Sequence, residues 1–202
     1  MSSPTDKREE RRSSVRVTGR NLFDFNILTP EQYKVLAEDF ESGLSLYNQK
    51  QLMDMQMFVG AQNALTKIAE KDADLAEFLQ HLDMKMNVLL QKADGKKSPI
   101  ESLKLRDLNL SGAGIAFICD KKIAMDAKLE MRIVLLPTYI FVYVIGRVTE
   151  CEPDRKEKGK TYYKWRVAFT LIMDEDREKL IQHNFRQQSL ALRNRRHQRD
   201  SD

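Results

Sequence analysis

Residues 107–117 read DLNLSGAGIAF, and this stretch sets the character of the second half of the chain. An N-x-S-x-x-G turn at 109–114 joins two apolar segments, since Asn, Ser and Gly are residues that tight turns favour. Outward from it, segments rich in Val, Ile, Tyr and Phe alternate with polar turns, as β-strands do. Several short strands of this kind are typical of a small antiparallel barrel. We predict strands at 100–107, 114–119, 127–135, 140–150 and 161–171, with a charged hairpin loop at 152–160.

A helical period governs residues 29–95. Thr29 is followed by Pro30 and then by Gln32, which together form a capping box with proline at the first helical position. From there to about residue 92 the chain has no further proline and few glycines, and its apolar residues recur at helical spacing. We therefore predict two or three helices inserted after a first β-like stretch. The predicted fold class is α+β, a small antiparallel barrel with an inserted helical bundle and a C-terminal helix.

The last predicted helix of this insertion carries a heptad-like apolar face, with steps of four, three, four and three residues. Such spacing lets helices pair along a seam, which indicates a homo-oligomer, either a dimer or a tetramer. A second interpretation stays open, in which the same face packs against other helices of its own chain. The face consists of Leu75, Leu79, Leu82, Met86 and Leu89.

The chain is predicted to end in a helix that closes the barrel. Three acidic residues at 174–176 suit the positive end of a helix dipole. Its barrel-facing side is predicted to carry Ile181, Phe185, Gln188 and Leu192. The domain boundaries that follow are an Arg-rich flexible loop at 1–16, the barrel and its helix at 17–28 and 98–196, the helical insertion at 29–95, and a disordered tail at 197–202.

Composition indicates a folded protein, with 42% hydrophobic and 32% charged residues. The formal charge is +4, and clusters of arginine near both ends could bind nucleic acid, anionic lipid or a phosphorylated small molecule. Nucleic acid is disfavoured because the predicted barrel shows no obvious row of exposed aromatic residues flanked by Lys and Arg. The sequence offers neither a membrane span nor a signal peptide, so we expect a cytoplasmic protein.

Catalysis is also disfavoured. The two cysteines, Cys119 and Cys151, do not match a metal-binding spacing, and there is no nucleophile elbow or Gly-rich phosphate loop. His81, His183 and His197 lie in predicted helices or the tail, where we expect them at the surface. We therefore predict a binding protein rather than an enzyme, with no metal and no cofactor.

Two polar clusters suit an anionic ligand that carries guanine. Arg12 and Arg16 form an R-x-x-x-R motif, and each guanidinium can bind phosphate oxygens or the O6/N7 edge of guanine, or stack on a base. Arg11 is a third candidate contact. The second cluster is the turn at 109–114.

The turn residues complement those arginines. Asn109 offers both donors and an acceptor to a guanine edge, and Ser111 can donate its hydroxyl to a phosphate or a base. Gly114 lacks a Cβ, which would let a ring system approach the backbone. These motifs are separated by more than 90 residues, so the candidate site depends on the helices returning the chain close to where it left the barrel.

Taken together, these motifs resemble the PilZ domains, bacterial receptors for the second messenger cyclic di-GMP. The likeness covers residues 10–16 and about 100–196, including the strand IGRV at 145–148 and the helix DREKLI at 176–181. The resemblance implies cyclic di-GMP as the ligand, with contacts from Arg11, Arg12, Arg16, Asn109, Ser111 and Gly114.

The leading functional hypothesis is a cyclic di-GMP effector. Ligand binding would order the Arg-rich N-terminal loop and change the surface offered to a protein target in motility, pili or biofilm formation. The alternative is an oligomeric adaptor, built by the helical insertion, that does not bind a nucleotide.

Overall fold

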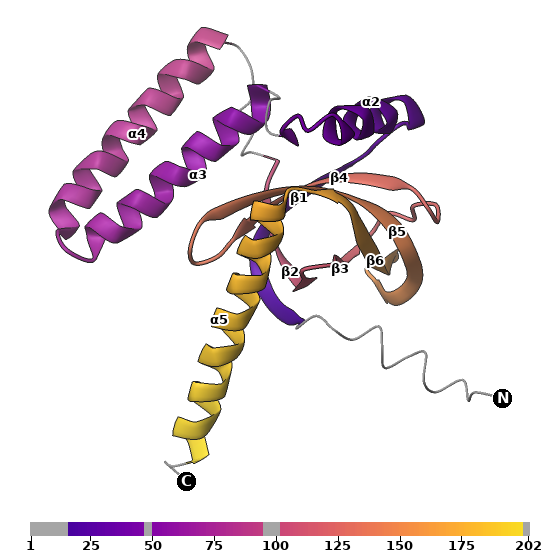
Figure 1. The fold of residues 1–202 in the computed structure, drawn as a ribbon. Coiled ribbons are helices and arrows are strands. Elements are labelled where there is room, and N and C mark those ends of the chain that lie inside the picture. Colours follow the sequence, from indigo (N-terminus) through magenta and orange to yellow (C-terminus); the bar gives the residue numbers. More distant parts are fainter. Residues whose placement is uncertain (1–15, 47–49, 95–101, 200–202) are drawn as a thin grey trace.

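The structure, a computed structural model, describes residues 16–46, 50–94 and 102–199 of the chain. Within this part, six strands build a barrel, three helices follow the first strand, and a fourth helix follows the last strand (Figure 1). The strands are β1 (Val17–Ile27), β2 (Lys104–Ser111), β3 (Gly114–Cys119), β4 (Lys128–Leu135), β5 (Ile140–Glu157) and β6 (Lys160–Ile172). The helices are α2 (Pro30–Glu41), α3 (Lys50–Ala69), α4 (Ala73–Asp94) and α5 (Asp174–Arg199).

The barrel is closed because β1 has a partner on each side. Its first part, from Val17 to Phe23, pairs antiparallel with β2, and its second part, from Leu22 to Ile27, pairs antiparallel with β4. The strand order around the barrel is β1-β2-β3-β6-β5-β4, and every neighbouring pair is antiparallel. The predicted fold class, an antiparallel barrel with inserted helices and a C-terminal helix, is confirmed.

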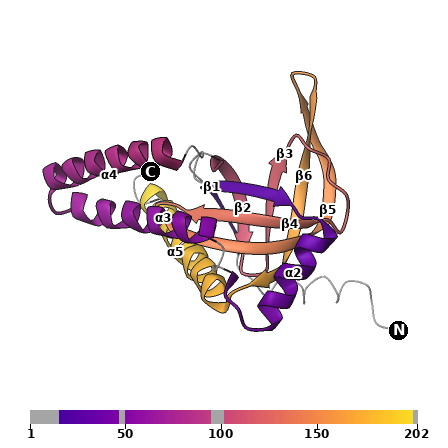
Figure 2. The ribbon, with the colours of Figure 1, turned by 90° about the horizontal axis from the view of Figure 1, so that it is seen from above.

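Two predicted turns are shorter than expected. The segment 109–114 is mostly strand, since β2 continues to Ser111 and β3 begins at Gly114. The predicted hairpin loop at 152–160 is also strand, except for Lys158 and Gly159, which adopt positive φ. Figure 2 shows this β5–β6 hairpin projecting beyond the barrel. Opposite charges that face each other across the strands, such as Glu157 and Lys160, favour its continuation.

The barrel interior contains the main hydrophobic core. Alternate residues of each strand point inward, as the pleat of a strand requires. Trp165 is fully buried there, and its ring stacks on Phe117 with centroids 6.2 Å apart. Phe117 in turn lies against Phe23, with centroids 4.9 Å apart. These aromatic rings fill the space between β1, β3 and β6.

A second core lies outside the barrel, beneath the inserted helices. Leu36 of α2 and Leu52 of α3 are buried together with Phe141 and Tyr143 of β5. The capping box at the start of α2 is present, because the Thr29 Oγ1 accepts from the Gln32 backbone N–H and the Gln32 side chain accepts from the Thr29 backbone N–H. The inserted helices therefore cover the side of the barrel that carries Phe141 and Tyr143.

A polar network anchors this covered side. The Tyr143 hydroxyl donates to a Glu130 carboxylate oxygen at 2.9 Å. Arg132 bridges Glu130 at 3.2 Å and Asp24 at 3.3 Å, and all three charged side chains are largely buried. Burial raises the pKa of the Tyr143 hydroxyl, and the Glu130 charge raises it further, so the group remains a donor.

Helices α3 and α4 form a hairpin beside the barrel (Figures 1 and 2). Most of the predicted apolar face of α4 is exposed, so the second interpretation, packing against other helices of the same chain, is wrong for those exposed residues. Leu79 alone is half-buried among the five predicted residues. The exposed apolar residues of α4 are Leu75 (46%), Phe78 (61%), Leu82 (39%), Met86 (57%) and Leu89 (65%). None of the described helices is long and apolar enough to cross a membrane.

The predicted barrel-facing side of α5 is correct at Ile181, which lies against the turn at Gly112, but wrong at Phe185, Gln188 and Leu192. Phe185 and Leu192 are 55% and 51% exposed, and the side that packs on the barrel carries the buried residues Leu180, His183 and Asn184. Leu180 joins the barrel core, whereas Asn184 donates to a backbone carbonyl group of the barrel, as described below. The helix also continues to Arg199, past the boundary predicted at 196.

Gly146 offers a test of the barrel packing. A Cβ at this position would lie 2.5 Å from Val167 Cγ1 and 2.8 Å from Met131 Cε. We expect Gly146→Ala to lower the free energy of unfolding by about 1–3 kcal/mol, measured by urea denaturation, since well-packed interiors do not accept an added methyl group.

Gly60 provides the control, because a Cβ there meets nothing within 4 Å in the middle of α3. Gly60→Ala should leave the protein equally stable, or up to about 1 kcal/mol more stable. Equal stability of Gly146→Ala and the wild type would contradict this description of the interior.

Candidate functional site

The pairing of β1 with β2 brings together two segments that are far apart in the sequence. Thr18 lies opposite Asn109 in the register, and the Asn109 Nδ2 donates to the Thr18 Oγ1 at 2.8 Å. Arg16 directly precedes Val17, which faces Leu110, and Arg16 is exposed. One predicted arginine therefore lies at the same end of the barrel as the predicted turn. Arg11 and Arg12 lie outside the described residues.

Ser111 closes the turn between β2 and β3. Its Oγ accepts from the backbone N–H groups of Ala113 at 3.3 Å and Gly114 at 3.1 Å, and donates to the Gly114 carbonyl at 3.1 Å. The residue is 6% exposed. The hydroxyl therefore has partners inside the turn, and its predicted contact with a phosphate or a base stays a prediction.

Gly114 has a reason to lack a Cβ that does not depend on a ligand. An added Cβ would lie 2.5 Å from the Val167 carbonyl oxygen, which is backbone and cannot move aside cheaply. The glycine thus permits the close approach of β3 and β6. Its predicted role in admitting a ring system stays a prediction.

Helix α5 packs against the same turn and donates hydrogen bonds to its backbone. The Asn184 Nδ2 donates to the Leu110 carbonyl at 3.0 Å, and an Arg177 guanidinium nitrogen donates to the Gly112 carbonyl at 2.9 Å. Ile181 lies so close that a Cβ on Gly112 would be 2.9 Å from its Cγ1. Sequence reasoning missed Arg177 and Asn184, because they bind backbone carbonyls and leave no pattern in residue types.

On the outer surface of the barrel, Asn109 belongs to a row of residues that lie opposite one another on neighbouring strands. The row runs from β1 through β2, β3 and β6 to β5. Asn109 lies opposite Ala116, which lies opposite Arg166, which lies opposite Glu150. Their sequence neighbours Leu110, Phe117, Trp165 and Val167 are buried inside the barrel, so this row faces outward. We call Thr18, Asn109, Ala116, Arg166 and Glu150 the outer row.

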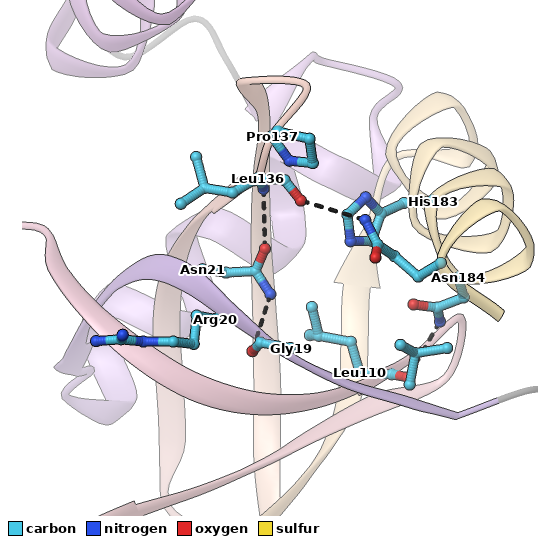
Figure 3. A pocket seen from close by; sticks show the side chains of 10 residues that line it. Gly19, Arg20, Asn21, Leu110, Leu136, Pro137, His183 and Asn184 are labelled. Carbon is cyan, nitrogen blue, oxygen red and sulfur yellow. Dashed lines mark hydrogen bonds between the residues drawn. The ribbon is translucent and has the colours of Figure 1, made fainter. Parts of the chain in front are cut away.

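A pocket of about 280 Å³ lies beside the site, between β1, the loop after β4 and α5 (Figure 3). Asn21 crosses it, accepting from the Leu136 N–H at 2.9 Å and donating to the Gly19 carbonyl at 3.3 Å. His183 lines it and is 7% exposed, so its predicted surface position is wrong.

Burial lowers the pKa of His183, and the nearby Arg186 charge lowers it further, which keeps the imidazole neutral near pH 7. The pocket is smaller than the common range for ligand sites. The side chains around it serve to hold α5 against the barrel. Among the residues that the structure describes, no group of three His, Cys, Asp or Glu residues could hold a metal ion.

Comparison with known proteins agrees with this fold. The family model of the PilZ domain matches residues 82–186, a little over half of the chain. The matched range contains Asn109, Ser111 and Gly114, but it begins after the N-terminal arginines and does not include them. No curated protein matches the chain.

Two structures of other proteins are similar. A pathogenic protein from Xanthomonas campestris, described as a tetrameric PilZ domain that self-assembles through an unusual helical bundle, is 11% identical with a TM-score of 0.49, over 94% of this chain and 97% of its own. The Bacillus subtilis inhibitor of motility is 22% identical with a TM-score of 0.37, over 44% of this chain and 43% of its own. Both similarities are low, so the family assignment rests on the domain match.

Asn184 gives a test of how α5 holds the turn. Asn184→Ala removes the donor to the buried Leu110 carbonyl and should lower the free energy of unfolding by about 1–3 kcal/mol in urea denaturation. Gln182→Ala is the matched control, because Gln182 is exposed and its side-chain amide donates to Glu178 one turn earlier in the same helix. It should change stability by less than about 0.5 kcal/mol. A similar loss in both variants would contradict the role of Asn184.

Proposed function

The chain belongs to the PilZ domain family, and on this basis we propose that it is a cytoplasmic cyclic di-GMP receptor rather than an enzyme. The observation that carries the proposal is the register of β1 against β2, in which Thr18, two residues after Arg16, lies opposite Asn109. A guanidinium and an amide then share one exposed end of the barrel. These are the groups that a ligand with phosphates and guanine bases requires.

Arg11 and Arg12 complete the proposed site from the N-terminal side. Arg12 lies four residues before Arg16, so an extended chain carries it at most about 14 Å away. That reach is comparable to the size of a cyclic dinucleotide. In this proposal two guanidinium groups close over the ligand while Asn109 binds a guanine edge.

Ser111 and Gly114 support the proposed site mainly by shaping it. The Ser111 hydroxyl fixes the turn, and Gly114 lets β3 approach β6. A rigid turn keeps Asn109 in one position, which lowers the entropy cost of binding. The binding contacts themselves then come chiefly from Arg11, Arg12, Arg16 and Asn109.

The proposed output is a change of surface. Binding draws the segment that carries Arg11 and Arg12 against the barrel, so a partner protein meets a different surface in the bound state. The partner class is a protein of motility, pili or biofilm formation. A ligand can only shift such an equilibrium by its difference in affinity for the two states.

Arg16 and Asn109 test the site. We expect Arg16→Ala to raise the Kd for cyclic di-GMP roughly tenfold to a hundredfold, since a lost charge-assisted hydrogen bond costs about 1.5–3 kcal/mol. Asn109→Ala should weaken binding in the same direction. Isothermal titration calorimetry measures both.

Arg193→Ala serves as the control, because Arg193 is an exposed arginine near the far end of α5. It should bind like the wild type. Absence of heat from the wild-type protein at tens of micromolar would reject the receptor proposal, whatever the variants do.

We also propose that α4 pairs with α4 of a second copy, so that the helical insertion builds a homo-oligomer. Five apolar side chains on one side of α4 are exposed, from Leu75 to Leu89. They recur at steps of three and four residues, which is the spacing of a helix-pairing seam. In the alternative function, this assembly is the whole role and the barrel acts as an adaptor without a nucleotide.

Leu82 tests the assembly. Leu82→Glu places a charge in the middle of the apolar stripe and should reduce the mass in light scattering to that of the 23.6 kDa monomer. Gln80→Glu adds the same charge at an exposed position on the opposite side of α4, and should leave the mass unchanged. A wild-type protein that is already monomeric would contradict the proposed oligomer.

A further inference from the structure

Two arginines on the outer surface of the barrel are not part of the candidate site described above. Arg166 belongs to the outer row, and Arg147 lies opposite Ala168 on the next step of the register. Both side chains are about half exposed, at 47% and 46%. They lie on β6 and β5, and along the outer row β2 and β3 separate these strands from β1, whose start Arg16 precedes.

Small residues separate these arginines from Asn109. Ala116 stands between Asn109 and Arg166, and Gly114 lies opposite Ala168, which in turn faces Arg147. Neighbouring strands are about 4.8 Å apart, so Asn109 and Arg166 are about 10 Å apart across two strands. The surface between them carries nothing larger than a methyl group. A flat ring can therefore lie against it and still reach a donor on each side.

Each of the two arginines is held by one exposed carboxylate. Arg166 contacts Glu150 at 2.5 Å, and Arg147 contacts Asp126 at 2.6 Å. Glu150 and Asp126 are 43% and 70% exposed. Exposed ion pairs contribute little net stability, so a phosphate can replace the carboxylate at small cost. A guanidinium also offers phosphate the same paired donors that it offers a carboxylate.

We propose that Arg166 and Arg147 are ligand-contacting residues that bind the phosphate or guanine groups on the far side of a cyclic dinucleotide, with Glu150 competing for Arg166 in the unbound state. This inference rests on the proposed receptor function and extends it across the barrel surface. A ligand with two phosphates then meets arginines from two directions, those near β1 and those on β5 and β6. The small residues between them form the floor of the site.

Because Glu150 competes with the ligand for Arg166, replacing either residue should change the Kd, but in opposite directions. Arg166→Ala removes a donor and should raise the Kd for cyclic di-GMP about tenfold in isothermal titration calorimetry. Glu150→Gln releases Arg166 from its carboxylate and should lower the Kd about threefold. A merely structural role for the pair predicts no gain of affinity from Glu150→Gln. Arg147→Ala gives a second measurement, with an expected increase in Kd.

Arg155→Ala is the matched control, because Arg155 is also an exposed arginine of β5, paired with Asp154 at 3.1 Å, but lies out on the projecting hairpin. It should bind like the wild type, and thermal unfolding should confirm that all variants remain folded. Wild-type binding with an unchanged Kd in both Arg166→Ala and Glu150→Gln would overturn this inference alone. A wild type that does not bind would overturn the receptor proposal together with it.

Discussion

The double pairing of β1 is the constraint on which the rest of the structure depends. One part of this strand bonds to β2 and the other to β4, so it closes the barrel at a point where the chain is interrupted by three helices. The cost of closing a long connection grows only slowly with its length, so an insertion of this size is tolerated. The same pairing fixes the register of Thr18 against Asn109. The interior core and the outer row both follow from it.

The polar side of α5 joins this closure to the candidate site. Buried carbonyls at the end of the barrel require donors, because an unpaired polar group inside a protein is costly. Arg177 and Asn184 supply those donors to the Gly112 and Leu110 carbonyls. A helix with only apolar side chains on this side would leave these carbonyls without donors. The turn that carries Ser111 is therefore held both by its own hydroxyl and by the helix behind it.

The inserted helices cover one part of the barrel surface, and the outer row lies on another part. The inserted helices bury Phe141 and Tyr143 on one side, and the network of Glu130 and Arg132 fixes that side. The outer row carries the small residue Ala116 between Asn109 and Arg166. The residues that the inserted helices bury thus lie apart from Arg16 and Asn109, and the helices do not cover the candidate site.

Several features were predictable from local patterns. The capping box at Thr29, the helical period after it and the strands around 114–119 and 127–135 are short-range signals, and all three agree with the structure. The side of α5 that packs on the barrel was predicted wrongly at Phe185 and Leu192, since apolar spacing does not show that Asn184 binds a backbone carbonyl. The buried position of His183 was missed for the same reason.

The sequence by itself determined which side chains are available, the arginines and Asn109 above all, and where the hydrophobic period changes from strand to helix and back. Only the tertiary structure decided that Thr18, next to the Arg16 segment, pairs with Asn109, that the Ser111 hydroxyl bonds within its turn, and that Arg166 lies in the same row of the outer surface. Strand register and hydrogen bonds to backbone groups cause this difference. Both depend on which segments meet in space, and neither leaves a mark in the order of residue types.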